Sequence, residues 1–366
     1  MIYENAYPQC MSLENVSIYD TTLRDGEQAP GVRFSIRQKL SIARRLAEIG
    51  IPEIEAGFPA VSQEEKLTVR KIARDGLNSR ILALSRIVKK DIDAVIESEA
   101  DAIILFASVS PLLLKYKMHK TLEEVIAQSV ESVEYARAHG LSVIYSAEDA
   151  TRTNLNTLMN VYKEVEKAGA SRVHIADTVG VATPHSISFM VYQIRKRLDS
   201  RTELCMHCHN DFGLATANAL SGLAAGANIA AATVNGIGER AGNVCLAELV
   251  MCLRILYGMD NGYDLKELQK LSKLVEKYSG IKNPPQKPLM GLNAFRHESG
   301  IHVAAVLENP LTYEPFAPEV LGIRRQIVLG KHSGKKAVIA KMDEKGRDCS
   351  AEEARIILEK LKKPEK

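Results

Sequence analysis

The chain has 366 residues, with 48 lysine and arginine side chains against 45 aspartates and glutamates, so its formal net charge is +3. A nearly neutral chain without a basic block gives no electrostatic reason to expect nucleic-acid binding. No run of about eighteen apolar residues is present, so we expect no membrane-spanning helix.

The cysteines and the N-terminus bear on the cellular compartment. Scattered cysteines in a long chain are typical of a reducing environment rather than of a disulfide framework. The six cysteines are Cys10, Cys205, Cys208, Cys245, Cys252 and Cys349. Residues 1–12 lack the basic-then-apolar pattern of a secretory signal. We therefore expect a cytoplasmic protein.

Short apolar runs alternate with longer amphipathic ones from residue 16 to residue 257. The apolar runs, rich in Ile, Val or Ala, are typical of buried parallel strands. They lie at 16–19, 53–56, 81–84, 102–106, 142–146, 172–176, 203–207 and 228–234. Helical patterns separate them, and several of these end at a glycine, which is a common helix C-cap. The helical patterns lie at 36–49, 62–75, 91–99, 122–139, 155–168, 184–198, 214–225 and 244–257.

This alternation predicts an α/β fold, a (β/α)8 TIM barrel, because eight strand–helix pairs fill about 240 residues. A doubly wound open sheet is the alternative, but no Gly-x-Gly-x-x-Gly follows the first predicted strand. We assign residues 1–260 to a barrel domain and residues 261–366 to a small, mainly helical C-terminal segment. That segment is too small for a rich core, so we expect it to lie across the barrel mouth or over a partner subunit.

Polar and charged residues crowd the predicted strand ends, where the active sites of such barrels lie. Residues two apart on a strand share a face, so His207 and His209 project together with Cys205 deeper on that face. Two imidazoles at a strand end form half of a divalent-metal site, although a pair of solvated histidines is the simpler interpretation. A carboxylate from another strand end would favour a metal.

Three long motifs resemble those of the acyl-CoA Claisen-condensing synthases, the group of 2-isopropylmalate, citramalate and homocitrate synthases. The motifs are Asp-Thr-Thr-Leu-Arg-Asp-Gly-Glu-Gln at 20–28, His-Cys-His-Asn-Asp at 207–211 and Asn-Gly-Ile-Gly-Glu-Arg-Ala-Gly-Asn at 235–243. Metal-dependent aldolases and lyases share part of the first motif. The segments at 293–302 and 312–314 favour the synthases over those enzymes. A barrel that binds ligands without catalysis is a third interpretation, which the complete polar set opposes.

The resemblance implies roles for individual residues. Arg24 would stabilise the developing negative oxygen, Thr178 would hold the substrate carboxylate, and Glu148 would be a candidate base for the acetyl methyl group. His302 and Tyr313 resemble the paired catalytic residues of the family, which often reach the barrel of a neighbouring subunit, so the resemblance also implies a homodimer. The implied metal ligands are Asp25, His207, His209 and Asn243. This nitrogen and oxygen set suits Mg, Mn or Zn.

Other polar groups at these ends need not be functional. We expect Asp149, Arg152, Asp177 and Glu239 to tie loops together, and His297 to fix a loop in the C-terminal segment. The implied substrates are acetyl-CoA and a 2-oxo acid.

The choice of 2-oxo acid rests on weaker signals. The sequence ends after a short tail, so we expect no large regulatory domain like that of leucine-controlled isopropylmalate synthases, and the loop after the fourth strand has Val109, Pro111 and Leu113 where isopropylmalate synthases usually have Thr, Asp and His. Both features favour a short homocitrate synthase, with isopropylmalate and citramalate synthases as alternatives.

Homocitrate formation needs a partner for a second carboxylate, which would be costly to bury unpaired. We expect Arg86, with Ser108 and Ser110, to supply it, because a guanidinium can grip a carboxylate with two bonds. Alternatively, Arg86 pairs with a barrel-end acid such as Glu55, and Val109 and Leu113 line an apolar pocket for 2-oxoisovalerate.

Overall fold

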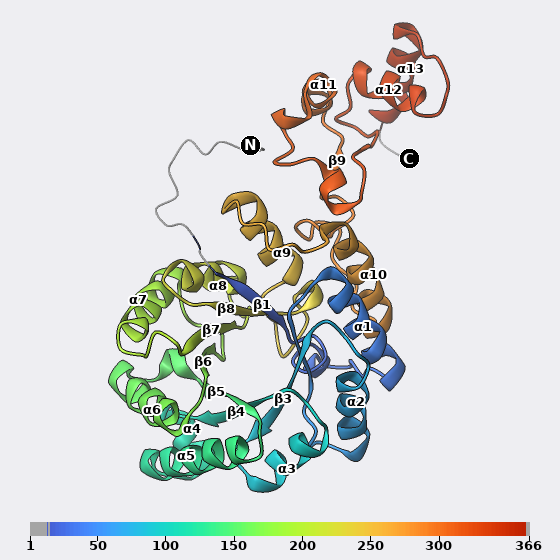
Figure 1. Cartoon of the computed structure of the whole chain (residues 1–366). Coiled ribbons are helices and arrows are strands. Elements are labelled where there is room, and N and C mark those ends of the chain that lie inside the picture. The colour runs from blue at the N-terminus through green and yellow to red at the C-terminus, as the bar shows by residue number, and fades with distance from the viewer. Residues whose placement is uncertain (1–12, 14, 364–366) are drawn as a thin grey trace. The chain divides into compact units, whose positions relative to one another are not determined.

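Eight parallel strands close into a barrel in this computed structural model, which describes residue 13 and residues 15–363 (Figure 1). Each strand pairs with the next, and β1 also pairs with β8, which closes the ring. The strands are β1 (Ser17–Asp20), β2 (Glu53–Gly57), β3 (Arg80–Arg86), β4 (Ala102–Ser108), β5 (Ser142–Glu148), β6 (Arg172–Asp177), β7 (Glu203–Cys208) and β8 (Ile229–Ala232). The predicted TIM barrel is confirmed.

Helices follow the strands and surround the barrel (Figure 1). They are α1 (Ile36–Ile49), α2 (Gln63–Ala73), α3 (Lys89–Glu97), α4 (Pro111–Leu113), α5 (Leu122–Ala138), α6 (Leu155–Ala168), α7 (Pro184–Arg195), α8 (Ala215–Ala224), α9 (Leu246–Met251) and α10 (Leu268–Ser279). The predicted bounds of α1 are exact because Ser35 and Gln38 form a capping box and Gly50 ends the helix with a φ of 97°. The pattern at 244–257 is a shorter helix, α9, continued by the π-helical turn Cys252–Leu256.

The barrel interior is an apolar core beneath the strand ends. Its buried members come from most of the strands and are Tyr19, Leu82, Leu84, Ala102, Ile104, Ile144, Cys205, Ile229 and Ala231. Cys205 therefore lies inside the barrel, as strand alternation predicted. At the opposite end from the cavity described below, the Arg172 guanidinium pairs with the buried Glu53 carboxylate at 2.6 Å.

The chain divides into two compact units. The barrel unit contains the described residues up to Asp264 together with Leu271–Ile281, so most of α10 groups with the barrel rather than with the C-terminal segment. The second unit contains Leu265–Lys270 and the residues from Lys282 onwards.

The C-terminal unit is small and mainly helical. Two short strands, β9 (Arg296–His297) and β10 (Gln326–Ile327), pair in parallel, and three helices pack beside them. The helices are α11 (Gly300–Glu308), α12 (Lys335–Asp343) and α13 (Ala351–Leu361). Val303 and Val338 are the fully buried centres of two small apolar clusters.

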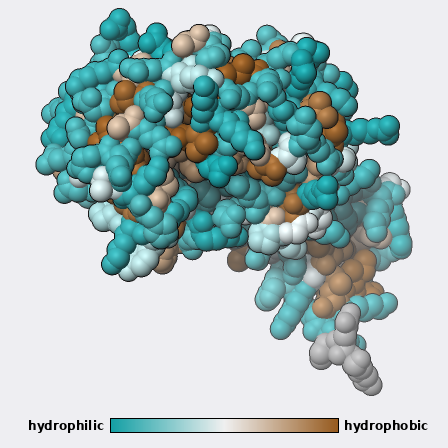
Figure 2. Space-filling view, turned by 90° about the horizontal axis from the view of Figure 1, so that it is seen from below, coloured by the Kyte–Doolittle hydropathy of each residue, from teal (hydrophilic) through white to brown (hydrophobic). Residues whose placement is uncertain are grey.

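Hydrophilic side chains cover most of the face shown in Figure 2, with hydrophobic ones in several separate places. Among the described residues, no helix is both long and apolar enough to span a membrane. Five described cysteines are free thiols. Cys10 and the other residues of 1–12, on which we based the absence of a signal, lie outside the described part of the chain.

Candidate active site

A cavity of about 300 Å³ lies at the C-terminal ends of the barrel strands. Its lining combines the two histidines of β7 with acidic, basic and aromatic side chains from most of the other strands. The titratable lining residues are Tyr19, Arg24, Asp25, Lys117, Glu148, His174, His207, His209, Glu239 and Arg240. This is the position at which the fold predicts the chemistry.

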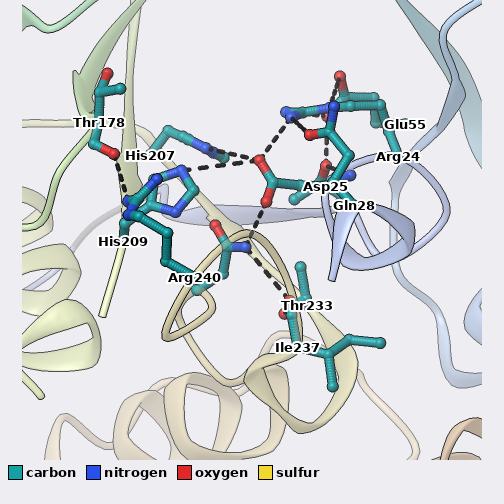
Figure 3. Close-up of polar contacts among 12 residues, drawn as sticks. Arg24, Asp25, Gln28, Glu55, Thr178, His207, His209, Thr233, Ile237 and Arg240 are labelled. Atoms are coloured by element: carbon teal, nitrogen blue, oxygen red, sulfur yellow. Dashed lines mark hydrogen bonds and ion pairs between the residues drawn. The ribbon is translucent and has the colours of Figure 1, made fainter. Parts of the chain in front are cut away.

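Asp25 and the two histidines meet at one wall of this cavity (Figure 3). The Oδ2 atom of Asp25 is 3.4 Å from Nε2 of His207 and 3.8 Å from Nε2 of His209. Candidate ligand atoms of all three residues lie within 4.8 Å of one another, and all three residues are buried. The structure thus brings together three of the four predicted metal ligands, which come from the ends of β1 and β7.

Asn243, the fourth predicted ligand, reaches the same cluster from the loop after β8. A β-bridge between His209 and Asn243 fixes that loop against the end of β7. The Nδ2 atom of Asn243 donates a hydrogen bond to Oδ1 of Asp25 at 2.7 Å. Gly238 makes this approach possible, because a Cβ atom there would lie 2.0 Å from Nδ2 of Asn243.

The nitrogen and oxygen atoms of this cluster are suitable ligands for a divalent cation. Within the described part of the chain, Oδ1 of Asn243 and Nδ1 of both histidines are buried without a hydrogen-bond partner. Burial and the neighbouring His207 lower the pKa of His209 to about 4, so its imidazole is neutral near pH 7, as a ligand must be. Burial opposes the charge of Asp25, but Arg24 and both histidines outweigh it and hold the Asp25 pKa well below its ordinary value.

Arg24 is locked in place by two buried carboxylates (Figure 3). Its Nε and Nη2 atoms donate to the two oxygens of Glu55 at 2.8 and 3.0 Å, and its Nη1 atom donates to Asp25 at 2.5 Å. Glu55 also accepts a hydrogen bond from the Thr21 hydroxyl at 2.6 Å. A cation fixed this firmly at the cavity wall can stabilise negative charge without reorganising.

Thr178 and Glu148 occupy the side of the cavity formed by β5 and β6. The Oγ1 atom of Thr178 accepts a hydrogen bond from the backbone N–H of Asp149 at 2.8 Å, which leaves its hydroxyl hydrogen for another acceptor. The Glu148 carboxylate accepts a hydrogen bond from the Ser108 hydroxyl and forms an ion pair with Lys117. Both predicted residues therefore line the cavity.

Arg86 and Ser110 are not among the residues that line this cavity. Arg86 follows the inward alternation of β3, but it is the exposed last residue of that strand and its Nε atom pairs with Asp91 at 2.6 Å. Asp91 is buried at the start of α3 and needs a cation. Ser110 is buried and bonds to Asp149. The structure thus places neither residue where the sequence analysis expected it.

Of the four residues expected to hold loops together, three do so, namely Asp149, Arg152 and Asp177. Arg152 pairs with Asp149 at 2.7 Å, and Asp177 accepts hydrogen bonds from the backbone N–H groups of Val181 and Ala182. Glu239 instead lines the cavity.

His302 and Tyr313 lie together in the C-terminal unit. Their rings stack with centroids 3.9 Å apart and planes 19° from parallel. His297 contacts Glu314 at 3.2 Å, and Arg325 holds the same carboxylate at 2.8 Å, so His297 fixes a loop as expected.

Comparison with known proteins identifies the family to which this chain belongs. The HMGL-like family model matches residues 15–275, and a model described as homocitrate synthase post-HMGL domain-like matches residues 289–366. The chain belongs to the HMGL-like family. This agrees with the resemblance inferred from the three motifs.

Several relatives of this HMGL-like chain are known. A homocitrate synthase AksA of Methanothermobacter thermautotrophicus is 52% identical over 96% of this chain and 89% of its own, and one of Methanocaldococcus jannaschii is 54% identical over 97% and 88%. A probable 2-isopropylmalate synthase of Ignicoccus hospitalis is 52% identical over 89% of this chain and 81% of its own. An HMG-CoA lyase of Bacillus subtilis shares the fold, with a TM-score of 0.67 at 18% identity, over 75% of this chain and 97% of that one.

Among the cavity residues of this HMGL-like chain to which the sequence assigned no role are His174 and Lys117. His174 lies inside β6, is buried, and stacks on Tyr19 with ring centroids 5.5 Å apart. Burial, together with the cations around it, holds the pKa of His174 well below its ordinary value. His174 lies two residues before Ala176 on the same strand, so strand alternation could have predicted that it faces the cavity. Lys117 lies on a π-helical turn, Leu114–Met118, which has no periodic signal to mark it.

Proposed function

We propose that this chain is an acyltransferase that condenses acetyl-CoA with 2-oxoglutarate to form homocitrate. The observation that carries this proposal is the buried cluster of Asp25, His207 and His209 beside the locked Arg24 at the barrel mouth. Two relatives that are 52% and 54% identical and are named homocitrate synthases support the acceptor. The relative that is named a probable 2-isopropylmalate synthase supports 2-oxoisovalerate as the alternative acceptor.

Four side chains would hold a divalent cation, namely Asp25, His207, His209 and Asn243. Once bound, the cation would polarise the ketone of the 2-oxo acid as a Lewis acid. Arg24 would pair with the ketone oxygen as negative charge develops on it, and Thr178 would donate its hydroxyl hydrogen to the substrate carboxylate.

Glu148 is the proposed base. It takes a proton from the methyl group of acetyl-CoA, and the electron pair of that C–H bond forms the new bond to the ketone carbon. The ketone oxygen becomes an alkoxide, which is then protonated. Water cleaves the thioester, so the net reaction consumes one water and releases the coenzyme A thiol.

Thiol release gives a direct test. Wild-type protein with acetyl-CoA is expected to release thiol with 2-oxoglutarate at a kcat/KM at least about tenfold above that with 2-oxoisovalerate, because a site that pairs a charge rejects a substrate lacking it. Preference for 2-oxoisovalerate would favour the isopropylmalate alternative. Cleavage of a carbon–carbon bond without coenzyme A would favour an aldolase or lyase.

We also propose a homodimer in which His302 and Tyr313 complete the site of the partner subunit. Their stacking within the C-terminal unit, whose core is small, supports a shared role. Inactive His207→Ala and inactive His302→Ala proteins, mixed in equal amounts and allowed to exchange subunits, are then expected to recover up to about a quarter of wild-type activity, since about half of the dimers are mixed and each of these contains one intact site out of two. Proven exchange without recovery would argue for a site within one chain. The cytoplasmic location stays a prediction.

A further inference from the structure

Lys117 and Glu148 form an ion pair at the rim of the cavity. The Nζ atom of Lys117 is 2.6 Å from each oxygen of the Glu148 carboxylate and 5.7 Å from the centroid of the Phe106 ring. The Lys117 side chain is 44% exposed and that of Glu148 is 21% exposed. The pair therefore lies where the cavity meets solvent, within reach of an entering substrate.

The cations that line the cavity differ in how firmly they are held. Arg24 is 12% exposed and donates two hydrogen bonds to the fully buried Glu55. Arg240 grips Asp211 with two nitrogens at 2.8 and 2.9 Å. Lys117 carries its charge on a flexible four-carbon stem, can rotate its three donors, and is more exposed than either arginine. It is the cation that can change partners at the smallest cost.

We propose that Lys117 selects dicarboxylic 2-oxo acids by exchanging one carboxylate for another. In the free enzyme its ammonium group pairs with Glu148. In the complex the ammonium group pairs with the distal carboxylate of the acceptor. The sequence alone suggests Arg86 as the partner of that carboxylate. This inference rests on the proposed condensation, in which Glu148 is the base.

The exchange also controls the proposed base. The ammonium group lies 2.6 Å from each oxygen of Glu148 and so covers both atoms with which the carboxylate would accept a proton. When Lys117 turns to the acceptor, Glu148 keeps the hydrogen bond from Ser108 and so keeps its position, while its carboxylate oxygens become free to accept a proton. A monocarboxylic acceptor has no distal carboxylate with which Lys117 can pair. Lys117 therefore stays on Glu148 and continues to cover its carboxylate.

The test compares Lys117→Met with Lys115→Met in the full-length, metal-loaded protein. Lys115 lies on the same π-helical turn, is exposed, and does not line the cavity. Lys117→Met is expected to lower kcat/KM and the affinity measured by calorimetry for 2-oxoglutarate by about 10- to 100-fold, as loss of a charge-assisted pair should. With 2-oxoisovalerate its kcat should rise about 2- to 5-fold, because the base is uncovered. Lys117→Arg should keep most of the preference, and Lys115→Met should match the wild type on both acceptors.

The outcomes separate this inference from the proposed function. If the wild type releases no thiol with any 2-oxo acid, the condensation itself is wrong. If the wild type prefers 2-oxoglutarate and Lys117→Met keeps that preference, the exchange is wrong while the condensation stands. An equal loss on both acceptors, with an unchanged melting temperature, would also overturn the exchange, because it would assign Lys117 a role that is independent of the distal carboxylate.

Discussion

Replacing Asp25 or His207 by alanine is expected to release the metal and to abolish turnover. Each change removes one donor from a buried set whose candidate ligand atoms lie within 4.8 Å of one another. Lewis-acid assistance contributes several kcal/mol to such reactions, so turnover should fall by about 10³-fold or more. Metal content is measured by elemental analysis after dialysis, and turnover by thiol release.

A histidine outside the site provides the matched control. His139 is exposed at the end of α5, where its Nδ1 atom contacts the Tyr135 carbonyl oxygen. His139→Ala should keep both metal content and turnover. Full metal occupancy together with normal turnover in Asp25→Ala and His207→Ala would contradict the assignment of these residues as ligands.

Replacing Arg24 by methionine is expected to cost both stability and activity. Glu55 is fully buried, and its two oxygens accept hydrogen bonds from Arg24 at 2.8 and 3.0 Å. Removing one partner of a buried ion pair leaves an uncompensated charge and costs about 3–5 kcal/mol. Urea unfolding measures this loss. Turnover should fall because the fixed cation beside the Asp25 cluster, which would stabilise the developing negative oxygen, is lost.

A second variant separates these two effects. Adding Glu55→Gln to Arg24→Met removes the stranded charge, so stability should recover in part while activity stays low. Arg44→Met, which breaks the exposed pair with Asp75, should leave stability and turnover unchanged. Recovery of activity in the double variant would show that Arg24 acts through folding alone.

The sequence predicted the barrel because its strands and helices carry strong periodic signals. Glycine and capping residues even fixed the bounds of α1, whereas the pattern at 244–257 hid a change from α-helix to π-helix after Met251. Periodicity reports which face of an element is apolar, and it does not distinguish these two helical hydrogen-bond patterns.

The candidate site was predictable where it depends on strand alternation and strand ends. His207 and His209 share a face of β7, and Asp25 follows β1, so the barrel topology brings them together. Arg86 shows where this reasoning fails. It lies at the end of β3, but its guanidinium pairs with the buried Asp91 on the following helix. Lys117 was missed because the position of a long side chain on an irregular turn depends on its tertiary partners.

Competition between acceptors measures directly which 2-oxo acid the enzyme prefers. Wild-type protein receives limiting acetyl-CoA and equal concentrations of 2-oxoglutarate and 2-oxoisovalerate, and mass spectrometry determines the ratio of the two products. That ratio equals the ratio of the two kcat/KM values. If 2-oxoglutarate is the preferred acceptor, homocitrate is expected in at least about tenfold excess over 2-isopropylmalate. An excess of 2-isopropylmalate would contradict it.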